Sequence, residues 1–306
     1  MSGFWISGWA TISPHGRGRK AFLDAAPRSR GVPDFDISEV LGAKGTRSIN
    51  RVTALAIATV GDLLADTGCP TGEGTGLVLG TTTGSVESMM SFTRSSLTAE
   101  RPYQVGPTLF PNTVMNCAAG KCAIWHDLRG PNTTIAGGRT TGLQALAYTS
   151  RLLRSGRAER VLVGAAEELS PARAWLTPGV PFTEGCAMLL VESGTGLAEI
   201  LSVRSRISPN GDISATLRSC VDAALDSASV SLKEIWAGSG IHLRGAKRLD
   251  GLPGEASSAT AVFRIASVLA EAERTPARAD RFALVTAHDV DGSVSALVLR
   301  VAGSGA

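Results

Sequence analysis

Histidine and cysteine are scarce in this chain of 306 residues, which has four histidines and five cysteines. The histidines are His15, His126, His242 and His288, and no two of them stand at the spacing of a metal-ligand pair. The cysteines are odd in number and form no C-x-x-C pair, so no disulfide framework is expected. The sequence therefore predicts reduced thiols and no metal site.

Long apolar runs and an excess of one charge are also missing. No run reaches the roughly 18 apolar residues that a membrane-spanning helix needs, and the opening MSGFWISGWATISP has no basic segment followed by a long apolar stretch. The formal net charge is only +3, and the GRGRK run at residues 16–20 is interpreted as a solvated loop. We expect a cytoplasmic protein that binds neither nucleic acids nor membranes.

The sequence does have a hydrophobic fraction of 43%, enough for a packed core, and segments that alternate between strand-like and helix-like patterns. Such alternation is typical of an α/β fold. Strands are expected at residues 4–12, 76–80, 132–136, 160–164, 186–191, 198–203, 234–237, 282–287 and 294–301. Helices are expected at residues 46–65, 112–126, 140–154, 212–228 and 257–273, and Ser85 or Thr83 can cap a further one.

The second half of the chain repeats the pattern of the first. The loop-rich stretch from Pro171 to Thr183, which has three prolines, predicts the seam between them. We therefore divide the chain into an N-terminal half at residues 1–170 and a C-terminal half at residues 171–306.

Common catalytic motifs are absent from the sequence. There is no G-x-S-x-G elbow, and neither GTGL (74–77) nor GSGIHLRG (238–245) continues as a dinucleotide-binding motif, so no cofactor is expected.

The most informative segment is RGPNTTIAGGRTTGLQALA at residues 129–147, which predicts a strand, a tight Gly137-Gly138 turn and a helix. The residue after such a turn lies at a helix N-terminus, where backbone N–H groups lower a thiol pKa and hold an anion. Arg139 stands there. A guanidinium is always protonated and is not a nucleophile, so no covalent acyl intermediate is expected at this position.

Extended to RGPNTTIAGGRTTGLQALAYTSRLLRSGRAERVLVGAAEE, this segment resembles the active-site segment of β-ketoacyl synthases. Further matches are LGAKGTRSINRVTALAIATVGDLLADTG (41–68), GLVLGTTTGS (76–85), LFPNTVMNCAAGKCAIWHDLRGP (109–131) and SALVLR (295–300). The resemblance covers nearly the whole chain. It implies a thiolase-like fold, in which two duplicated α/β halves pack in the layer order α-β-α-β-α.

The chain departs from this family at the residues that carry the chemistry. In the family, the position of Arg139 is the acyl-accepting cysteine, and two histidines from the second half help decarboxylate malonyl units. Here the segment LPGEASSATAVF (252–263) has Gly254 or Glu255 near the place of the second histidine. His242 is a possible remnant of the first, and the glycine-rich gate before the last strand, TAHDVDGSVSA (286–296), keeps only Gly292.

Such a loss is similar to that in chain-length factors, the ketosynthase β subunits of type II polyketide systems. The resemblance implies a non-catalytic subunit that forms a heterodimer with a catalytic ketosynthase and shapes the acyl tunnel during polyketide elongation on an acyl carrier protein. Apparent deletions after the first strand and through the second half are compatible with factors of reducing, polyene-forming systems. Antibiotic biosynthesis is the expected context, with no cofactor and no catalytic residue of this chain's own.

The same resemblance assigns tunnel and interface residues. In the family, the helix corresponding to residues 112–125 lies at the dimer interface and lines the tunnel. The candidate tunnel and interface residues are Thr113, Val114, Met115, Cys117, Ala118 and Leu143. Cys117 and Cys122 are interpreted as structural thiols. Arg139 either has a structural role, paired with a carboxylate such as Glu167 or Glu168, or contacts a partner or substrate.

Two other functions remain open at this stage. One is an acyltransferase or decarboxylase that uses an unexpected residue, and the other is a homodimeric acyl-binding scaffold. Co-expression with a ketosynthase distinguishes the three, since only a chain-length factor forms a stable one-to-one complex and lacks turnover when isolated.

Overall fold

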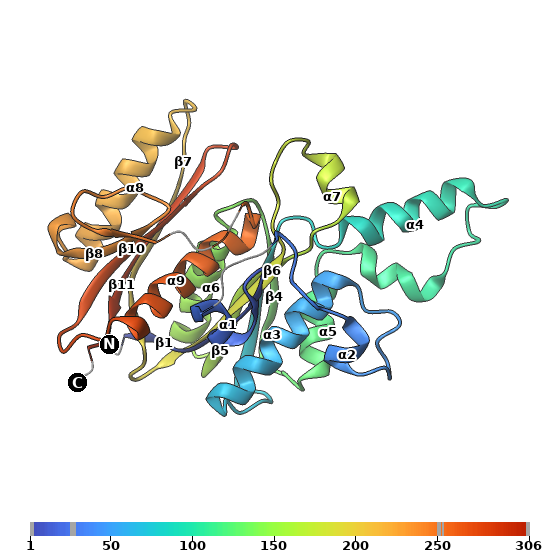
Figure 1. Ribbon diagram of the computed structural model, residues 1–306, viewed down its shortest axis with the longest axis horizontal. Coiled ribbons are helices and arrows are strands. Elements are labelled where there is room, and N and C mark those ends of the chain that lie inside the picture. The colour runs from blue at the N-terminus through green and yellow to red at the C-terminus, as the bar shows by residue number, and fades with distance from the viewer. Residues whose placement is uncertain (1–2, 25–28, 250–251, 253, 304–306) are drawn as a thin grey trace.

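The computed structural model describes residues 3–24, 29–249, 252 and 254–303 (Figure 1). The first elements are β1 (Phe4–Ser13), β2 (Gly16–Arg17), α1 (Gly18–Asp24), α2 (Ile37–Leu41), α3 (Arg51–Thr67), β3 (Thr75–Thr81), α4 (Val86–Thr98), the 3-10 helix η1 (Pro107–Thr113), α5 (Cys117–Trp125), β4 (Asn132–Ala136), α6 (Thr141–Arg154) and β5 (Arg160–Glu167). They are followed by α7 (Pro171–Leu176), β6 (Gly185–Ser193), β7 (Ala198–Ile207), α8 (Ile213–Ala228), η2 (Leu232–Glu234), β8 (Ile235–Ser239), β9 (Lys247–Arg248), η3 (Ser257–Ala259), α9 (Thr260–Arg274), β10 (Arg281–His288) and β11 (Ser293–Val301).

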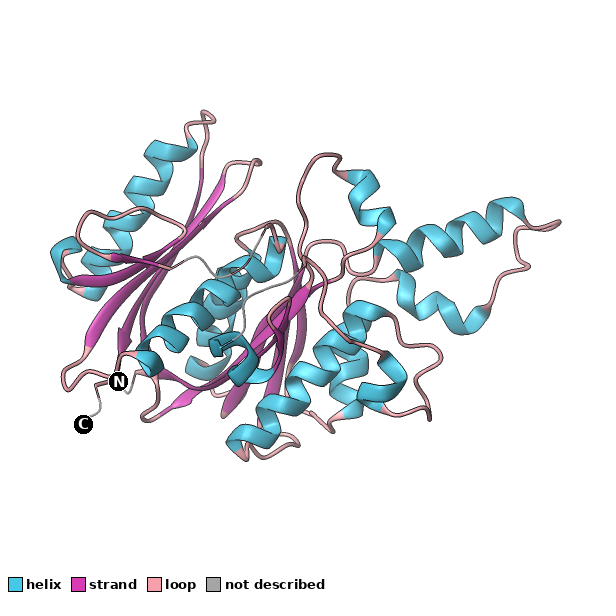
Figure 2. Cartoon of the chain, viewed as in Figure 1, coloured by secondary structure: helices cyan, strands magenta, loops and turns pink. Residues whose placement is uncertain are grey.

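Within the described residues, eleven strands form one mixed sheet, and β1 joins its two parts. The strand order is β4-β3-β5-β6-β1-β7-β11-β10-β8-β9, with β2 attached to β1. Residues Phe4 to Ile6 of β1 pair with β6 on one side and with β7 on the other. Pairing with β6 then continues to Ile12, after a register shift between Ile6 and Gly8. The two parts of the sheet diverge from this junction, with helices between them (Figure 2).

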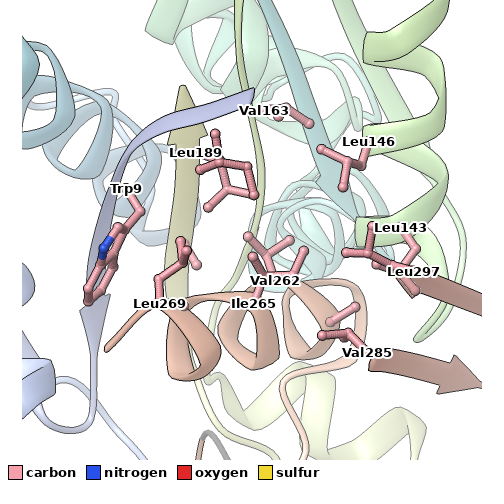
Figure 3. Packing of buried hydrophobic residues seen from close by; sticks show 14 of the residues in the cluster. Trp9, Leu143, Leu146, Val163, Leu189, Val262, Ile265, Leu269, Val285 and Leu297 are labelled. Carbon is pink, nitrogen blue, oxygen red and sulfur yellow. The ribbon is translucent and has the colours of Figure 1, made fainter. Parts of the chain in front are cut away.

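Three buried apolar clusters define the layers of the molecule. A central cluster contains α6 and α9 and the facing strand residues, such as Val163 of β5 and Val285 of β10 (Figure 3). One outer cluster joins α3 and α5 to the other face of β5 through Leu162. The second outer cluster joins α8 to the other face of β10 through Leu284. Because neighbouring strand residues point to opposite faces, these clusters give the predicted layer order α-β-α-β-α.

The strand predictions agree with the structure to within a few residues, while one helix begins later than predicted. The helix expected at residues 46–65 begins at Arg51, because the side chain of Asn50 accepts the backbone N–H of Thr53 and caps it. It ends where Gly68 adopts a left-handed conformation with φ 64°. Ser85, one of the two predicted caps, accepts the N–H of Ser88 at the start of α4.

The single helix predicted at residues 112–126 is wrong. The segment is divided into η1, which contains Pro111, and α5, which begins at Cys117. The N–H of Val114 donates to the carbonyl of Pro111 at 3.5 Å, and the N–H of Cys117 donates to the carbonyl of Val114 at 3.2 Å, so the chain turns between the two helices and does not continue as one. Val114 has extended backbone angles between the two helices.

The predicted seam between the halves contains one helix of its own. Ser170 caps α7 by accepting the N–H of Arg173. The division after residue 170 stays a prediction, and β6, which follows it, lies between β5 and β1 in the sheet. Among the residues that the structure describes, no helix combines the length and the apolar character needed to cross a membrane.

Candidate functional site

The predicted strand-turn-helix elbow is formed by β4, residues 137–140 and α6. β4 pairs in parallel with β3, and the N–H of Gly137 donates to the carbonyl of Thr81 at 3.2 Å. The N–H of Thr141 donates to the carbonyl of Gly138 at 3.2 Å, which closes the turn. Arg139 is therefore held in this turn, with Thr140 between it and Thr141, the first residue of α6, as the sequence predicts.

The side chain of Arg139 forms an ion pair with Glu255. The Nε atom of Arg139 lies 2.8 Å from Oε2 of Glu255, and the two side chains are 33% and 18% exposed. The other carboxylate oxygen of Glu255 accepts from the N–H of Ser257 at 2.8 Å and the hydroxyl of Thr260 at 2.9 Å. Glu255 is thus fixed at the start of η3 and α9, and it presents a negative charge to the elbow.

The predicted pairing of Arg139 with Glu167 or Glu168 is wrong, because both carboxylates have other partners. Glu167 is fully buried, forms an ion pair with Arg173 at 3.2 Å and accepts from the hydroxyl of Ser258 at 2.5 Å. Glu168 accepts from the hydroxyl of Ser85 at 3.1 Å. Burial raises the pKa of Glu168. These two residues hold the end of β5 against neighbouring loops.

A second carboxylate contacts the backbone of the elbow. Oδ2 of Asp289, in the β10–β11 turn, accepts the N–H of Arg139 at 2.6 Å. Oδ1 of Asp289 accepts the N–H of Val290, also at 2.6 Å. The same carboxylate lies against Gly138, since a Cβ built on that glycine would be 1.5 Å from Oδ2. Asp289 therefore occupies the space directly in front of the N–H of Arg139.

His288 completes this group of charged and polar residues. Burial, together with the positive charges of Arg264 and Arg139, lowers the pKa of His288. This favours the neutral imidazole, and its buried Nδ1 atom has no hydrogen-bond partner among the residues that the structure describes. By contrast, His242, the predicted remnant of a catalytic histidine, is exposed in the loop after β8.

The predicted tunnel residues divide into two groups. Thr113 ends η1, Val114 and Met115 follow it and are 45% and 48% exposed, and Cys117 begins α5. Ala118 is buried in the outer cluster next to α3. The structure brings these five residues together at the η1–α5 junction.

Leu143 does not belong to that group. It is buried in the central cluster, on the other face of the sheet from Ala118 (Figure 3). Its side chain packs between α6 and α9 as part of the core.

The η1–α5 junction is tied to the body by polar contacts. The Nζ atom of Lys121 donates to the carbonyl of Ser48 at 2.6 Å and to Oδ1 of Asn112 at 2.7 Å. Asn112 in turn donates from Nδ2 to the carbonyl of Ser48 at 2.9 Å. The end of η1 and the middle of α5 are thus anchored to the segment before α3, while Val114 and Met115, which lie between the two helices, remain at the surface.

The thiols near this junction are poor nucleophiles. Burial raises the pKa of the Cys117 thiol, which is opposed by the nearby charge of Lys121. Burial also raises the pKa of Cys122, and it raises the pKa of Cys186 to about 12. A thiol must ionise to act as a nucleophile, so these side chains are suited to packing. In the part of the chain that the structure describes, no three His, Cys, Asp or Glu side chains gather as a metal site would need.

Comparisons with known proteins show a family that the N-terminal half of the chain matches. The family description "Beta-ketoacyl synthase, N-terminal domain" matches residues 29–177. The chain is 32% identical to 3-oxoacyl-[acyl-carrier-protein] synthase 2 of Vibrio harveyi over 143 residues, which cover 45% of this chain and 34% of that protein. It is 31% identical to the tetracenomycin polyketide synthase ketoacyl synthase alpha subunit of Streptomyces glaucescens over 192 residues, 53% of this chain and 45% of that one. The chain therefore matches less than half the length of these two relatives.

A solved structure extends the similarity to the whole fold. A chain of the ishigamide ketosynthase/chain length factor is 38% identical, with a TM-score of 0.90, over 98% of this chain and 100% of that one. This chain belongs to the β-ketoacyl synthase family. Its fold is the thiolase-like fold expected from the resemblance. The assignment of Arg139 to the place of the family's cysteine, and of Gly254 or Glu255 to the neighbourhood of its second histidine, stays a prediction.

Sequence reasoning missed two residues of this altered site. Asp289 and His288 lie in the segment TAHDVDGSVSA, for which the sequence predicts only the remnant of a glycine-rich gate. Their contact with the elbow depends on the β10–β11 turn reaching the end of β4, a tertiary relationship that no local pattern encodes. The sequence offers one signal for this contact, which is the charge of Asp289 in a segment that the resemblance predicts to be rich in glycine.

Proposed function

We propose that this chain is a non-catalytic chain-length factor, which pairs with a catalytic ketosynthase and shapes the acyl tunnel during elongation of a polyketide. A narrower form of the proposal is that this polyketide is a polyene. The ketosynthase supplies the nucleophile, and the growing chain is presented by an acyl carrier protein that binds the complex.

The observation that carries the proposal is the ion pair between Arg139 and Glu255. In the family, one position would hold the acyl-accepting cysteine and the other lies near a histidine that supports decarboxylation. Here the two positions neutralise each other at 2.8 Å. Neither a guanidinium nor a carboxylate paired with it supplies the thiolate that forms an acyl-enzyme, so the elbow supports a structural role.

An uncovered edge of the sheet supports the need for a partner. β4 ends the strand order, and its sequence NTTIA contains neither a charge nor a proline. Natural proteins usually protect such an edge, and an unprotected one pairs readily with another chain. The side chain of Asn132 donates to the carbonyl of Ala119 at 3.0 Å, which places α5 beside this edge.

Exposed apolar side chains surround the same side of the molecule, where α4 and the following segment project from the body (Figure 1). These side chains, which we call the α4–α5 surface, are Met89, Leu97, Leu109, Phe110, Val114, Met115, Ile124 and Trp125. Ile124 is 85% exposed. A concentration of exposed apolar residues is a mark of an interaction surface, and α5, which carries Ile124 and ends at Trp125, lies beside the edge strand β4.

The η1–α5 junction is the proposed length gate. Val114 and Met115 lie on the α4–α5 surface. A cleft of about 240 Å³ between α4 and η1 is lined in part by Phe92, Leu109 and Asn112, the last of these two residues before Val114. A tunnel shared with the partner at this surface would end against these side chains. Leu143, buried in the central core, is left out of this proposed gate.

The experiment is co-expression with the ketosynthase subunit of the ishigamide system or another cysteine-bearing ketosynthase, followed by size-exclusion chromatography. We expect a one-to-one complex that Ile124→Lys weakens, because a charge would enter an apolar interface. The matched control is Leu232→Lys, an exposed leucine before β8, at the far end of the sheet from β4. A chain that forms only homodimers, or a complex weakened equally by both substitutions, would contradict the proposal.

A further inference from the structure

We propose that Asp289 is an internal anion that fills the oxyanion-binding position of the elbow, so that this position is closed to an acyl carbonyl. This assignment rests on the proposed function, in which the elbow has lost acyl transfer, and it names a second residue that prevents that reaction. Its tests need neither a partner nor a carrier protein, so they can fail independently of the proposed heterodimer.

The position in question is the backbone N–H of Arg139. In acyl transfer at a strand-turn-helix elbow, a backbone N–H beside the nucleophile stabilises the negative oxygen of the tetrahedral intermediate at about 2.7–3.1 Å. The N–H of Arg139 has the matching place, in the turn that leads to Thr140, the N-cap residue of α6. It already donates to Oδ2 of Asp289 at 2.6 Å. A carboxylate oxygen thus takes the place that a developing oxyanion would need.

The carboxylate of Asp289 is held in this place from its own side. Its second oxygen accepts the N–H of Val290, and the Asp289 N–H donates to the carbonyl of Ser293 at 2.9 Å. The N–H of Gly292 donates to the carbonyl of Asp289 at 3.2 Å, where Gly292 has a φ of 89°. The β10–β11 turn therefore presents the carboxylate toward the elbow in a fixed orientation.

Gly138 gives independent evidence that the position is built around this carboxylate. A Cβ on Gly138 would meet three atoms of Asp289, the nearest at 1.5 Å, and these are the closest atoms to it. The backbone of Gly138 does not have a positive φ, so its conformation is open to alanine. The side chain of Asp289, and not the turn itself, is thus the reason that this residue must be glycine.

The filled position has a chemical consequence beyond the missing cysteine. Restoring a thiol at residue 139 would place it beside a fixed negative charge and an N–H that is already bonded. Both effects disfavour the thiolate, since a like charge raises a thiol pKa and the free N–H of a helix N-terminus lowers it. Two residues therefore prevent acyl transfer at the elbow. Arg139 supplies no nucleophile, and Asp289 occupies the N–H that an oxyanion would need.

The first test measures thiol reactivity in an Arg139→Cys background. Alkylation by iodoacetamide is followed from pH 6 to 9 by mass spectrometry, with peptide mapping to separate this site from the native cysteines. Adding Asp289→Ala should speed alkylation at pH 7 by about tenfold and lower the apparent thiol pKa by about one unit. The matched control is Asp212→Ala, which removes a carboxylate from the N-terminus of α8 and should leave the rate unchanged. Equal rates with and without Asp289 would overturn the proposal.

The second test keeps Arg139 and uses unfolding of the whole chain. Gly138→Ala should lower the Tm by about 3 °C or more, because the new methyl group displaces the carboxylate from the N–H of Arg139. In an Asp289→Ala background the same substitution should leave the Tm nearly unchanged. A Gly138→Ala effect of the same size in both backgrounds would show that Asp289 does not fill this position.

Discussion

The guanidinium of Arg139 lies 2.8 Å from the carboxylate of Glu255, and this ion pair connects the N-terminus of α6 to the start of η3 and α9. The resemblance to β-ketoacyl synthases predicts that these two places correspond to groups that act on the acyl chain in that family. Here they hold a cation and an anion that satisfy each other. The pair joins the two helices of the central layer.

The ion pair should stabilise the fold modestly. Arg139→Ala leaves the carboxylate of Glu255 without its cation, but the arginine is 33% exposed, so we expect a loss of about 1–2 kcal/mol, below the value for a fully buried pair. Glu255→Gln should cost a similar amount. A double-mutant cycle measured by urea unfolding should give a coupling energy of about 1 kcal/mol. Additive effects of the two substitutions would mean that the pair contributes nothing.

A cysteine at the elbow should not restore condensation. In Arg139→Cys, the thiol would still lack the two histidines of the family, because Glu255 is near the place of one and His242 is exposed away from the buried core. The measurement is decarboxylation of a malonyl carrier protein and condensation by the purified variant. Turnover above that of the unaltered chain would show that a working set of residues survives in the second half.

Stability should depend on pH through Glu168. Burial raises the pKa of Glu168 in the folded chain, so the folded state binds its proton more tightly than the unfolded state does. The free energy of unfolding then falls as pH rises from the ordinary glutamate pKa, about 4.3, through the raised one. Glu168→Gln keeps an oxygen that can accept from Ser85 and removes this titration.

Urea unfolding of wild type and Glu168→Gln between pH 4.5 and 7.5 measures the effect. The stability of the variant relative to wild type should increase with pH across this window and then level off. A flat difference for Glu168→Gln would contradict the raised pKa.

The η1–α5 junction should influence product length. Val114→Phe fills space at the proposed end of the tunnel and should shorten the product, whereas Met115→Ala opens space and should lengthen it. Both residues are half-exposed in a non-helical segment, so the fold should tolerate either change. Products of the reconstituted heterodimer, analysed by mass spectrometry, report the shift. If both variants form an intact complex and give products of unchanged length, the residues that limit chain length lie on another surface.

The sequence predicted the layered fold well, because strands and helices with strong periodicity pack as their apolar faces require. The segments 132–136 and 140–154 match β4 and α6 almost to the residue. The errors in the predicted helices arise where local interactions compete with the apolar pattern. Asn50 caps α3, which begins at Arg51, five residues after the predicted start, and the extended backbone of Val114 interrupts the helix expected at residues 112–126. In each case the local backbone conformation overrode the apolar pattern.

The altered site was only partly predictable. Arg139 could be placed from the strand, the glycine pair and the helix that follow one another in the chain. Its partner could not, since Glu255 and Asp289 reach the elbow from the second half through tertiary packing. Glu167 and Glu168 were closer in sequence, but Arg173, Ser258 and Ser85 satisfy them at the end of β5.

The central claim is that this chain contributes a surface and not a nucleophile to condensation. The most direct measurement incubates the chain with an acylated carrier protein and malonyl carrier protein, alone and with its ketosynthase, and follows acyl adducts by intact mass together with product formation. We predict no adduct on this chain in either sample, and product only when both subunits are present. An acyl adduct on Cys117 or Cys122, or product from the isolated chain, would contradict the account.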